Sequence, residues 1–343
     1  MHRLPAAEAA LQRTLATVPP SSGAVVMGTA IVSIALSLDG HETLSRILLL
    51  IAAAVWVALG GVLIGRAARD RPRFHHEARS PAALAGVAGT AVLGTRLTLL
   101  GWPWAGVALL VIALLLWVAL LAPVLSHWVT PTVGVSLLLT VSTESLAVLA
   151  ATLAVTEHTG WLLFAALVPF VLGLAFYVFV IARFDPRQLG LGHGDQWITG
   201  GALAISTLAA ARITLAAKAL TTLGGDSGAL KGVSIGLWVL TILWLPVLLL
   251  AEALRPRLNY DVRRWSTVFP VGMYAACSFV VGTAASAPAI SSFARVWVWV
   301  AVAVWLIVFA AMLHRGSQIA RGQHPSPHPD RIVEIAPTRH RAA

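Results

Sequence analysis

Residues 137–154 read LLLTVSTESLAVLAATLA, and residues 161–182 read WLLFAALVPFVLGLAFYVFVIA. Each stretch is close to the roughly 20 mostly apolar residues that a helix needs to cross a bilayer. Their amino-acid compositions differ: the first is rich in small and hydroxyl side chains, while the second consists mostly of bulky aliphatic and aromatic ones. This pair decides the fold, since the same contrast recurs along the whole chain.

The composition indicates a membrane protein. Of 343 residues, 58% are hydrophobic and 11% are charged, whereas soluble domains carry about 25% charged residues. A water-soluble enzyme is therefore excluded, and an all-α membrane protein with ten transmembrane helices is expected. The predicted spans are 22–38, 47–65, 82–99, 103–123, 132–156, 160–182, 197–222, 233–252, 265–286 and 290–313.

The distribution of basic residues predicts the orientation. Eighteen Lys and Arg residues lie in the N-terminal segment, the C-terminal tail and the loops after even-numbered spans, against only Arg46, Lys231 and Arg295 in the opposite loops. Because cytoplasmic loops carry the excess of Lys and Arg, both termini are expected in the cytoplasm of a cell whose inner (plasma) membrane holds the protein. The domain prediction is a cytoplasmic segment 1–18, a membrane domain 19–313 and a disordered cytoplasmic tail 314–343. The net charge of +10 reflects this orientation and does not indicate nucleic acid.

Two kinds of span alternate. Gly, Ser and Thr number 36 in the odd-numbered spans and 11 in the even-numbered ones, which have nearly the same total length, while nine tryptophans lie in the even-numbered spans. Small residues allow close helix approach, and large Leu and Trp surfaces suit lipid. We expect five helical hairpins around a central pore, with odd helices inside and even helices outside. Helix contact alone would explain part of this pattern.

Apart from Glu252 and Arg295, near the ends of spans 233–252 and 290–313, charged residues inside spans occur only on odd-numbered ones: Arg96, Glu144, Arg212 and Lys218. Such residues are costly in a membrane and generally face a cavity or a partner. Arg96 and Arg212 lie roughly 22 Å from their cytoplasmic span ends at helical rise, and Glu144 lies roughly 18 Å in. These four residues are the predicted charges of an anion path. The alternatives are that Arg96 and Lys218 extend to the interface and that Glu144 is structural.

Three strings carry a family resemblance: LLLTVSTESLAVLAATLA (137–154), DQWITGGALAIST (195–207) and RRWSTVFPVGMYAACSF (263–279). They resemble the tellurite-resistance/C4-dicarboxylate transporter family, which includes plant slow-type anion channels and yeast malate permeases. The likeness covers roughly residues 20–313. It implies five hairpins around a pore, commonly as a homotrimer, with a phenylalanine on the ninth helix that occludes the pore. Phe269, before Pro270, matches that position.

The residues themselves also place a gate on the ninth span. The only aromatic residues in the interiors of the odd-numbered spans are Phe269, Tyr274 and Phe279. Pro270 removes a backbone donor and favours a kink beside Phe269. Tyr274 and Phe279 remain alternative gates, and packing of Phe269 between helices remains an alternative to gating.

The expected function is transport of small anions, either inorganic anions, tellurite or C4-dicarboxylates such as malate. Where the family commonly has Ala-Ser/Thr-Gln-Ser, this chain has Ser142-Thr143-Glu144-Ser145, so a proton-coupled dicarboxylate carrier using Glu144 is the alternative. A membrane-embedded enzyme on a lipid-linked substrate is a remote third. The expected partners are small anions and the bilayer. No cofactor and no metal are expected, and His75-His76-Glu77 is interpreted as a solvated loop.

Overall fold

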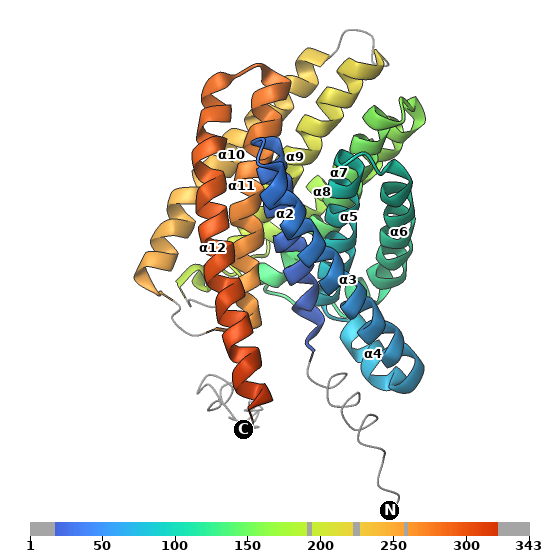
Figure 1. The fold of residues 1–343 in the computed structure, drawn as a ribbon, viewed down its shortest axis with the longest axis vertical. Helices are drawn as coiled ribbons and strands as arrows, with labels where there is room; N and C mark the ends of the chain where they lie inside the picture. Colours follow the sequence, from blue (N-terminus) through green and yellow to red (C-terminus); the bar gives the residue numbers. More distant parts are fainter. Residues whose placement is uncertain (1–17, 191–193, 222–226, 257–259, 322–343) are drawn as a thin grey trace, which may run out of the picture.

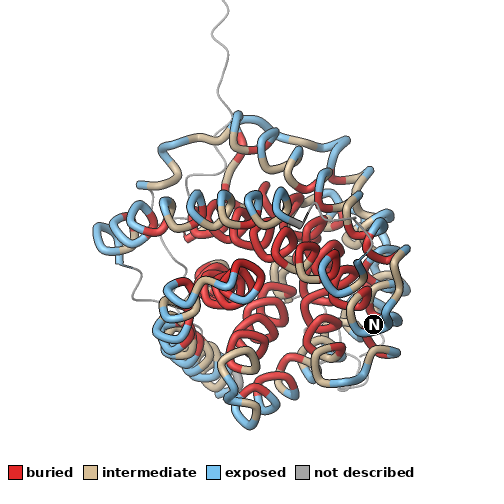
Figure 2. Tube along the Cα trace, turned by 90° about the horizontal axis from the view of Figure 1, so that it is seen from above, coloured by how far each residue is buried: buried red, intermediate tan, exposed pale blue. Residues whose placement is uncertain are grey.

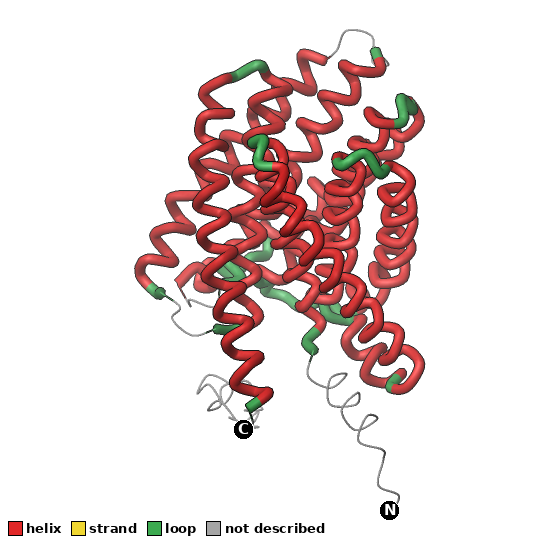
Figure 3. The backbone as a smooth tube through the Cα atoms, viewed as in Figure 1, coloured by secondary structure: helices red, strands yellow, loops and turns green. Residues whose placement is uncertain are grey.

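The computed structural model describes residues 18–190, 194–221, 227–256 and 260–321, and these residues form helices joined by short connections (Figures 1 and 3). Ten of the helices are long and apolar enough to cross a membrane, which confirms the all-α prediction. They are α2 (Gly23–Leu38), α3 (Glu42–Arg69), α5 (Leu84–Leu99), α6 (Pro103–Ser126), α7 (Leu138–Thr156), α8 (Gly160–Ile181), α9 (Trp197–Leu220), α10 (Ser227–Leu254), α11 (Trp265–Ala285) and α12 (Pro288–Ala320).

Shorter elements precede the inner helices. One α-helix, α4 (Arg71–Ala78), follows α3, and the 3-10 turns are η1 (Pro20–Ser22), η2 (Pro81–Ala83), η3 (Gly134–Leu137), η4 (Pro186–Gly190) and η5 (Val262–Arg264). Several boundaries differ from the predicted ones, including the starts of α3, α7 and α10 and the end of α12. α3 begins at Glu42 because polar residues of a connection can form the first helical turn. α12 continues to Ala320 because a helix makes its own backbone hydrogen bonds, so it can continue beyond the membrane. α12 therefore continues into the segment 314–343 that was predicted as the tail. Residues 1–17 and 322–343 lie outside the described residues.

Five helices form an inner group. α2, α5, α7, α9 and α11 contact one another in this order, and α11 contacts α2 again, so the group is a closed ring. Each inner helix also packs against the outer helix that follows it in the sequence. The most apolar stretches of the inner helices are 72–94% buried, against 17–22% for the outer helices. Figure 2 shows the buried inner helices surrounded by partly exposed outer ones.

Tryptophans of the outer helices form hydrogen bonds between one helical hairpin and the next. In four cases an indole N–H donates to a hydroxyl on the inner helix of the following hairpin, at 2.8–3.0 Å. The expectation that these tryptophans simply face lipid is therefore incomplete, because a buried indole N–H needs an acceptor where water is absent. The pairs are Trp56–Thr90, Trp117–Thr143, Trp238–Ser278 and Trp305–Thr29, the last of which closes the ring from α12 to α2.

Two glycine pairs have different surroundings. A Cβ on Gly201 would lie 2.7 Å from Cγ of Pro270, and one on Gly200 would meet the Tyr274 hydroxyl, so both glycines permit close approach to α11. A Cβ on Gly60 or Gly61 would meet nothing within 4 Å. Of these two pairs, Gly200-Gly201 is therefore the one at which helices pack closely.

Candidate functional site

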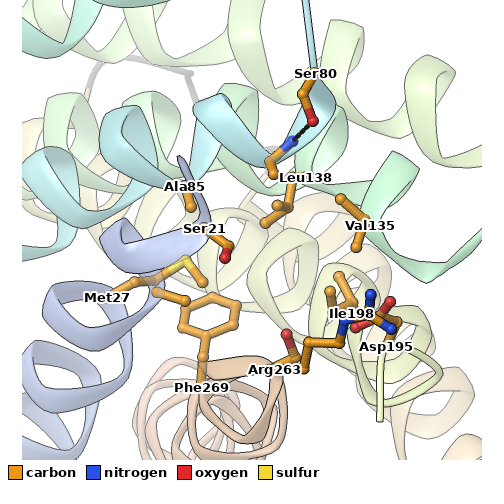
Figure 4. Close-up of a pocket in the computed structure, with 13 residues that line it drawn as sticks. Ser21, Met27, Ser80, Ala85, Val135, Leu138, Asp195, Ile198, Arg263 and Phe269 are labelled. Carbon is orange, nitrogen blue, oxygen red and sulfur yellow. Dashed lines mark hydrogen bonds between the residues drawn. The ribbon is translucent and has the colours of Figure 1, made fainter. Parts of the chain in front are cut away.

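A cavity of about 260 Å³ lies at one end of the ring of inner helices (Figure 4). All five inner helices contribute residues from their first two turns, so five helix N-termini converge on it. Helix N-termini carry partial positive charge, which favours anions nearby. The apolar lining comprises Ala24, Met27, Ala85, Leu138, Ile198 and Phe269, among others.

Polar residues line the remainder of this cavity. They are Ser21, Ser80, Asp195, Arg263 and Ser266, and Figure 4 shows Arg263 and Asp195 on the same side of it. The sequence analysis did not identify these polar lining residues, although each of them lies within a few positions of the start of an inner helix. That position is the signal that would have found them, because parallel helices in a ring bring such residues together.

Phe269 lies in the wall of the cavity and is fully buried. The next residues on the same helix faces, one heptad further along, are all buried: Ile31, Val92, Ser145, Ile205 and Ala276. Positions seven apart share a helix face, so side chains fill the ring above the cavity. Phe269 lies where the cavity ends and these buried side chains begin. This position is compatible with the predicted gate, which stays a prediction.

Arg212 continues the row of Ile198 and Ile205 on α9. It lies two heptads beyond the cavity wall, about 21 Å at helical rise. Its Nε and Nη2 atoms are buried and make no hydrogen bond with the described residues. The side chain as a whole is partly exposed, and it forms no ion pair with the described residues. A guanidinium with unused donors in such a place can bind an anion.

Arg96 lies in a different setting, between α2, α3 and α5. Its Nη2 donates to Oε1 of Glu42 at 2.7 Å, and its Nε donates to the Ser45 hydroxyl at 2.9 Å and the Ser33 hydroxyl at 3.3 Å. The Arg96 side chain is fully buried, while that of Glu42 is 36% exposed. The carboxylate of an outer helix therefore pairs with Arg96, and this arrangement favours a structural role over the predicted place in an anion path.

Lys218 lies near the opposite end of α9 from the cavity. Its Nζ donates to the Ala284 carbonyl at 2.7 Å, and Lys218 as a whole is exposed. This contact satisfies one of the last carbonyls of α11, as cations near helix C-termini do. It fits the interfacial alternative for Lys218.

Glu144 faces α8 and α9. A Cβ on Gly173 of α8 would lie 2.6 Å from Cγ of Glu144, and the Ser206 hydroxyl of α9 lies beside the carboxyl group. Both carboxyl oxygens are buried and have no hydrogen-bond partner among the described residues. Adjacent Ser145 shares a face with cavity-lining Leu138, so the Glu144 side chain leaves α7 on another face.

The alternative gates differ from Phe269 in their contacts. The Tyr274 hydroxyl donates to the Thr241 carbonyl of α10 at 3.1 Å, and its ring packs edge-on against Trp297 of α12 with centroids 6.2 Å apart. Tyr274 is therefore directed toward outer helices. Phe279 is 7% exposed and does not line the cavity.

The described residues contain no group of three His, Cys, Asp or Glu side chains that could hold a metal ion. A closed ring of helices within ten membrane-crossing helices, with a cavity at one end, defines a polytopic membrane protein with the architecture of a transport protein. Residues 17–313 match the family model of SLAC1, the voltage-dependent anion channel. The chain belongs to this family, which confirms the resemblance found in the sequence; the family is one of transporters and not of enzymes.

Two mycobacterial relatives are also similar. They are the uncharacterized membrane proteins MT1776 and Rv1735c, from Mycobacterium tuberculosis strains CDC 1551 / Oshkosh and ATCC 25618 / H37Rv. Each is 38% identical to this chain over 123 residues, which make up 34% of this chain. The match spans 62% of the length of each relative.

Proposed function

We propose that this protein carries small anions across the cell membrane through the centre of the ring formed by α2, α5, α7, α9 and α11. The observation that carries the proposal is one cavity to which every inner helix contributes, with Phe269 in its wall. Phe269 is the gate in this proposal, and Pro270 positions it. The buried side chains above the cavity then correspond to a closed state, in which a dry apolar constriction blocks ions.

Positive charge at both ends of the path supports an anionic substrate. Five helix N-termini surround the cavity, and Arg212 offers unused donors about 21 Å further along the same face of α9. Lys218, near the far mouth, would contribute to capture of anions from solution. Inorganic anions, tellurite and C4-dicarboxylates such as malate all carry negatively charged oxygen or halide atoms to which a guanidinium donates hydrogen bonds.

The Arg212 guanidinium supplies the test. Arg212→Gln should lower anion flux into vesicles of reconstituted protein by at least tenfold, because a buried charge lowers the barrier for every anion in a low-dielectric path. Lys218→Gln is the matched control, and its smaller effect should vanish at high salt, which screens exposed charges. Equal and small effects of both substitutions would rule out Arg212 as part of the path.

A proton-coupled dicarboxylate carrier is the second candidate, because both carboxyl oxygens of Glu144 are buried without a hydrogen-bond partner among the described residues. In that mechanism Glu144 takes up and releases a proton during each cycle. Glu144→Gln should then abolish the pH dependence of malate uptake. Flux that keeps its pH dependence in this variant would assign Glu144 to packing between α7, α8 and α9 and leave the channel proposal standing.

The assembly and orientation belong to the same proposal. We propose that both termini lie in the cytoplasm, because the excess of basic residues is on one side, and a homotrimer is proposed by family resemblance. The cavity then opens toward the cytoplasm, since η1 and the start of α2 lie at the same end of the molecule as the end of α12 (Figure 1).

A further inference from the structure

A second hollow lies outside the ring, between α4 and the end of the outer helix α6. It is an open groove of about 400 Å³, and four of its lining residues are polar: His75, Arg79, Ser126 and His127. Figure 1 shows α4 beyond the end of α6, at the same end of the molecule as the start of α2. The groove therefore lies in the outer layer of helices, at the depth where the membrane surface would meet the end of α6.

The charges of α4 are divided between two faces. Its carboxylate, Glu77, is bound by Arg66 at 2.7 Å and by Arg73 at 2.8 Å. His75 and Arg79 are four residues apart and so lie on one helix face. Neither forms an ion pair with the described residues. The groove thus contains a guanidinium whose charge has no acidic partner in the described part of the chain.

The opposite wall presents polar groups that are held in place. The Ser126 hydroxyl donates to the Pro123 carbonyl at 3.1 Å, and Nδ1 of His127 lies 3.0 Å from both that carbonyl and the Ser126 hydroxyl. Beside them, Leu125 is 40% exposed and Val129 is 74% exposed. Polar donors and bare apolar side chains therefore adjoin at the end of one membrane helix.

We propose that this groove binds the phosphate-bearing headgroup of an anionic phospholipid. Arg79 pairs with the phosphate and His75 donates to it, while the Ser126 hydroxyl and the His127 ring exchange their bonds to the Pro123 carbonyl for bonds to the phosphate. The acyl chains lie along the exposed apolar side chains of α6. Basic pockets beside membrane helices at the interface take such headgroups. A free phosphate would use the same donors and would leave the apolar wall unused, so the lipid is the better match. This proposal does not depend on the transport function.

Native mass spectrometry of the purified full-length protein in neutral detergent tests the proposal. We expect phosphatidylglycerol to be retained and phosphatidylcholine to be lost under the same conditions. The double variant His75→Gln/Arg79→Gln should bind phosphatidylglycerol at least about fivefold more weakly, the loss expected for one basic residue near an anionic surface. Arg187→Gln is the matched control, because Arg187 is exposed in η4 and outside the groove.

A second variant on the other wall, Ser126→Ala/His127→Gln, guards against misfolding of α4 and should also weaken retention of phosphatidylglycerol. An excess of inorganic phosphate should leave the bound lipid in place. Three results would overturn the proposal: equal retention by all variants, equal retention of phosphatidylcholine, or displacement of the lipid by inorganic phosphate alone.

Discussion

The Phe269 ring has two possible contributions, closure of the ring and packing between helices, and they predict opposite signs. If Phe269 is the gate, Phe269→Ala raises basal anion flux while the protein stays folded, because the dry constriction opens. If it only packs, the substitution costs roughly 3–5 kcal/mol of stability, as for other buried Phe→Ala changes. Vesicle flux and thermal unfolding of the same preparation decide between them.

Phe279→Ala is the control for this substitution. Phe279 is on the same helix and buried to 7% exposure, but it is not part of the cavity wall. We expect reduced stability and no gain of flux. A gain of flux in Phe279→Ala and none in Phe269→Ala would transfer the gate to Phe279.

Glu42 allows a buried and an exposed arginine to be compared on one carboxylate. Arg96 and Arg46 both bind its Oε1, at 2.7 and 3.0 Å, but their side chains are 0% and 62% exposed. Arg96→Ala should lower the free energy of unfolding by about 2–3 kcal/mol, since breaking a buried pair is costly and Glu42 is itself partly exposed. Arg46→Ala should cost about 0.5 kcal/mol or less. Denaturant unfolding in detergent measures both, and equal losses would contradict the structural role of Arg96.

At the scale of helices, the contact between α9 and α11 depends on Gly201. Gly201→Ala would place a Cβ 2.7 Å from Cγ of Pro270, and overpacking of this kind costs about 1–3 kcal/mol. It should also displace the turn that carries Phe269. Gly61→Ala is the matched control, because nothing lies within 4 Å of its added Cβ. Lower melting temperature is expected for Gly201→Ala only; an equal melting temperature for both variants would refute close packing at this site.

The contacts between hairpins explain the place of Glu144. Four outer helices donate a tryptophan N–H to the next inner helix. At the contact of α8 with α9, Gly173 adjoins the Glu144 carboxyl instead, with Ser206 beside it. A carboxyl group from α7 therefore occupies space that a large side chain of α8 would otherwise fill. This gives Glu144 a packing role whether or not it also binds protons.

For the whole molecule, the proposed orientation is open to a labelling test. The single native cysteine, Cys277, is buried and gives a low background for thiol reagents. Arg187 and Glu157 are exposed and lie in connections on opposite predicted sides of the membrane. An impermeant maleimide applied to intact cells should label Glu157→Cys and spare Arg187→Cys, while both should react after permeabilisation. The reverse pattern would invert the orientation.

The sequence by itself determined the all-α class, the ten membrane-crossing helices and the family. These features depend on local quantities: the length of apolar runs, the spacing of small residues, and strings such as WSTVFP at 265–270. It also indicated which helices are inside, because small, hydroxyl-rich faces suit close helix contact. None of these inferences requires knowledge of which side chains meet.

Only the tertiary structure separated the four charged residues that the sequence had grouped by depth. Depth along a helix follows from counting residues, but direction around the ring depends on which neighbour each face meets. Arg96 meets Glu42 of α3, Glu144 meets Gly173 of α8, and Arg212, two heptads after cavity-lining Ile198, has buried donors that no described residue binds. The cavity itself is assembled from five segments far apart in the chain, because the ring brings the first turns of five parallel helices to one place.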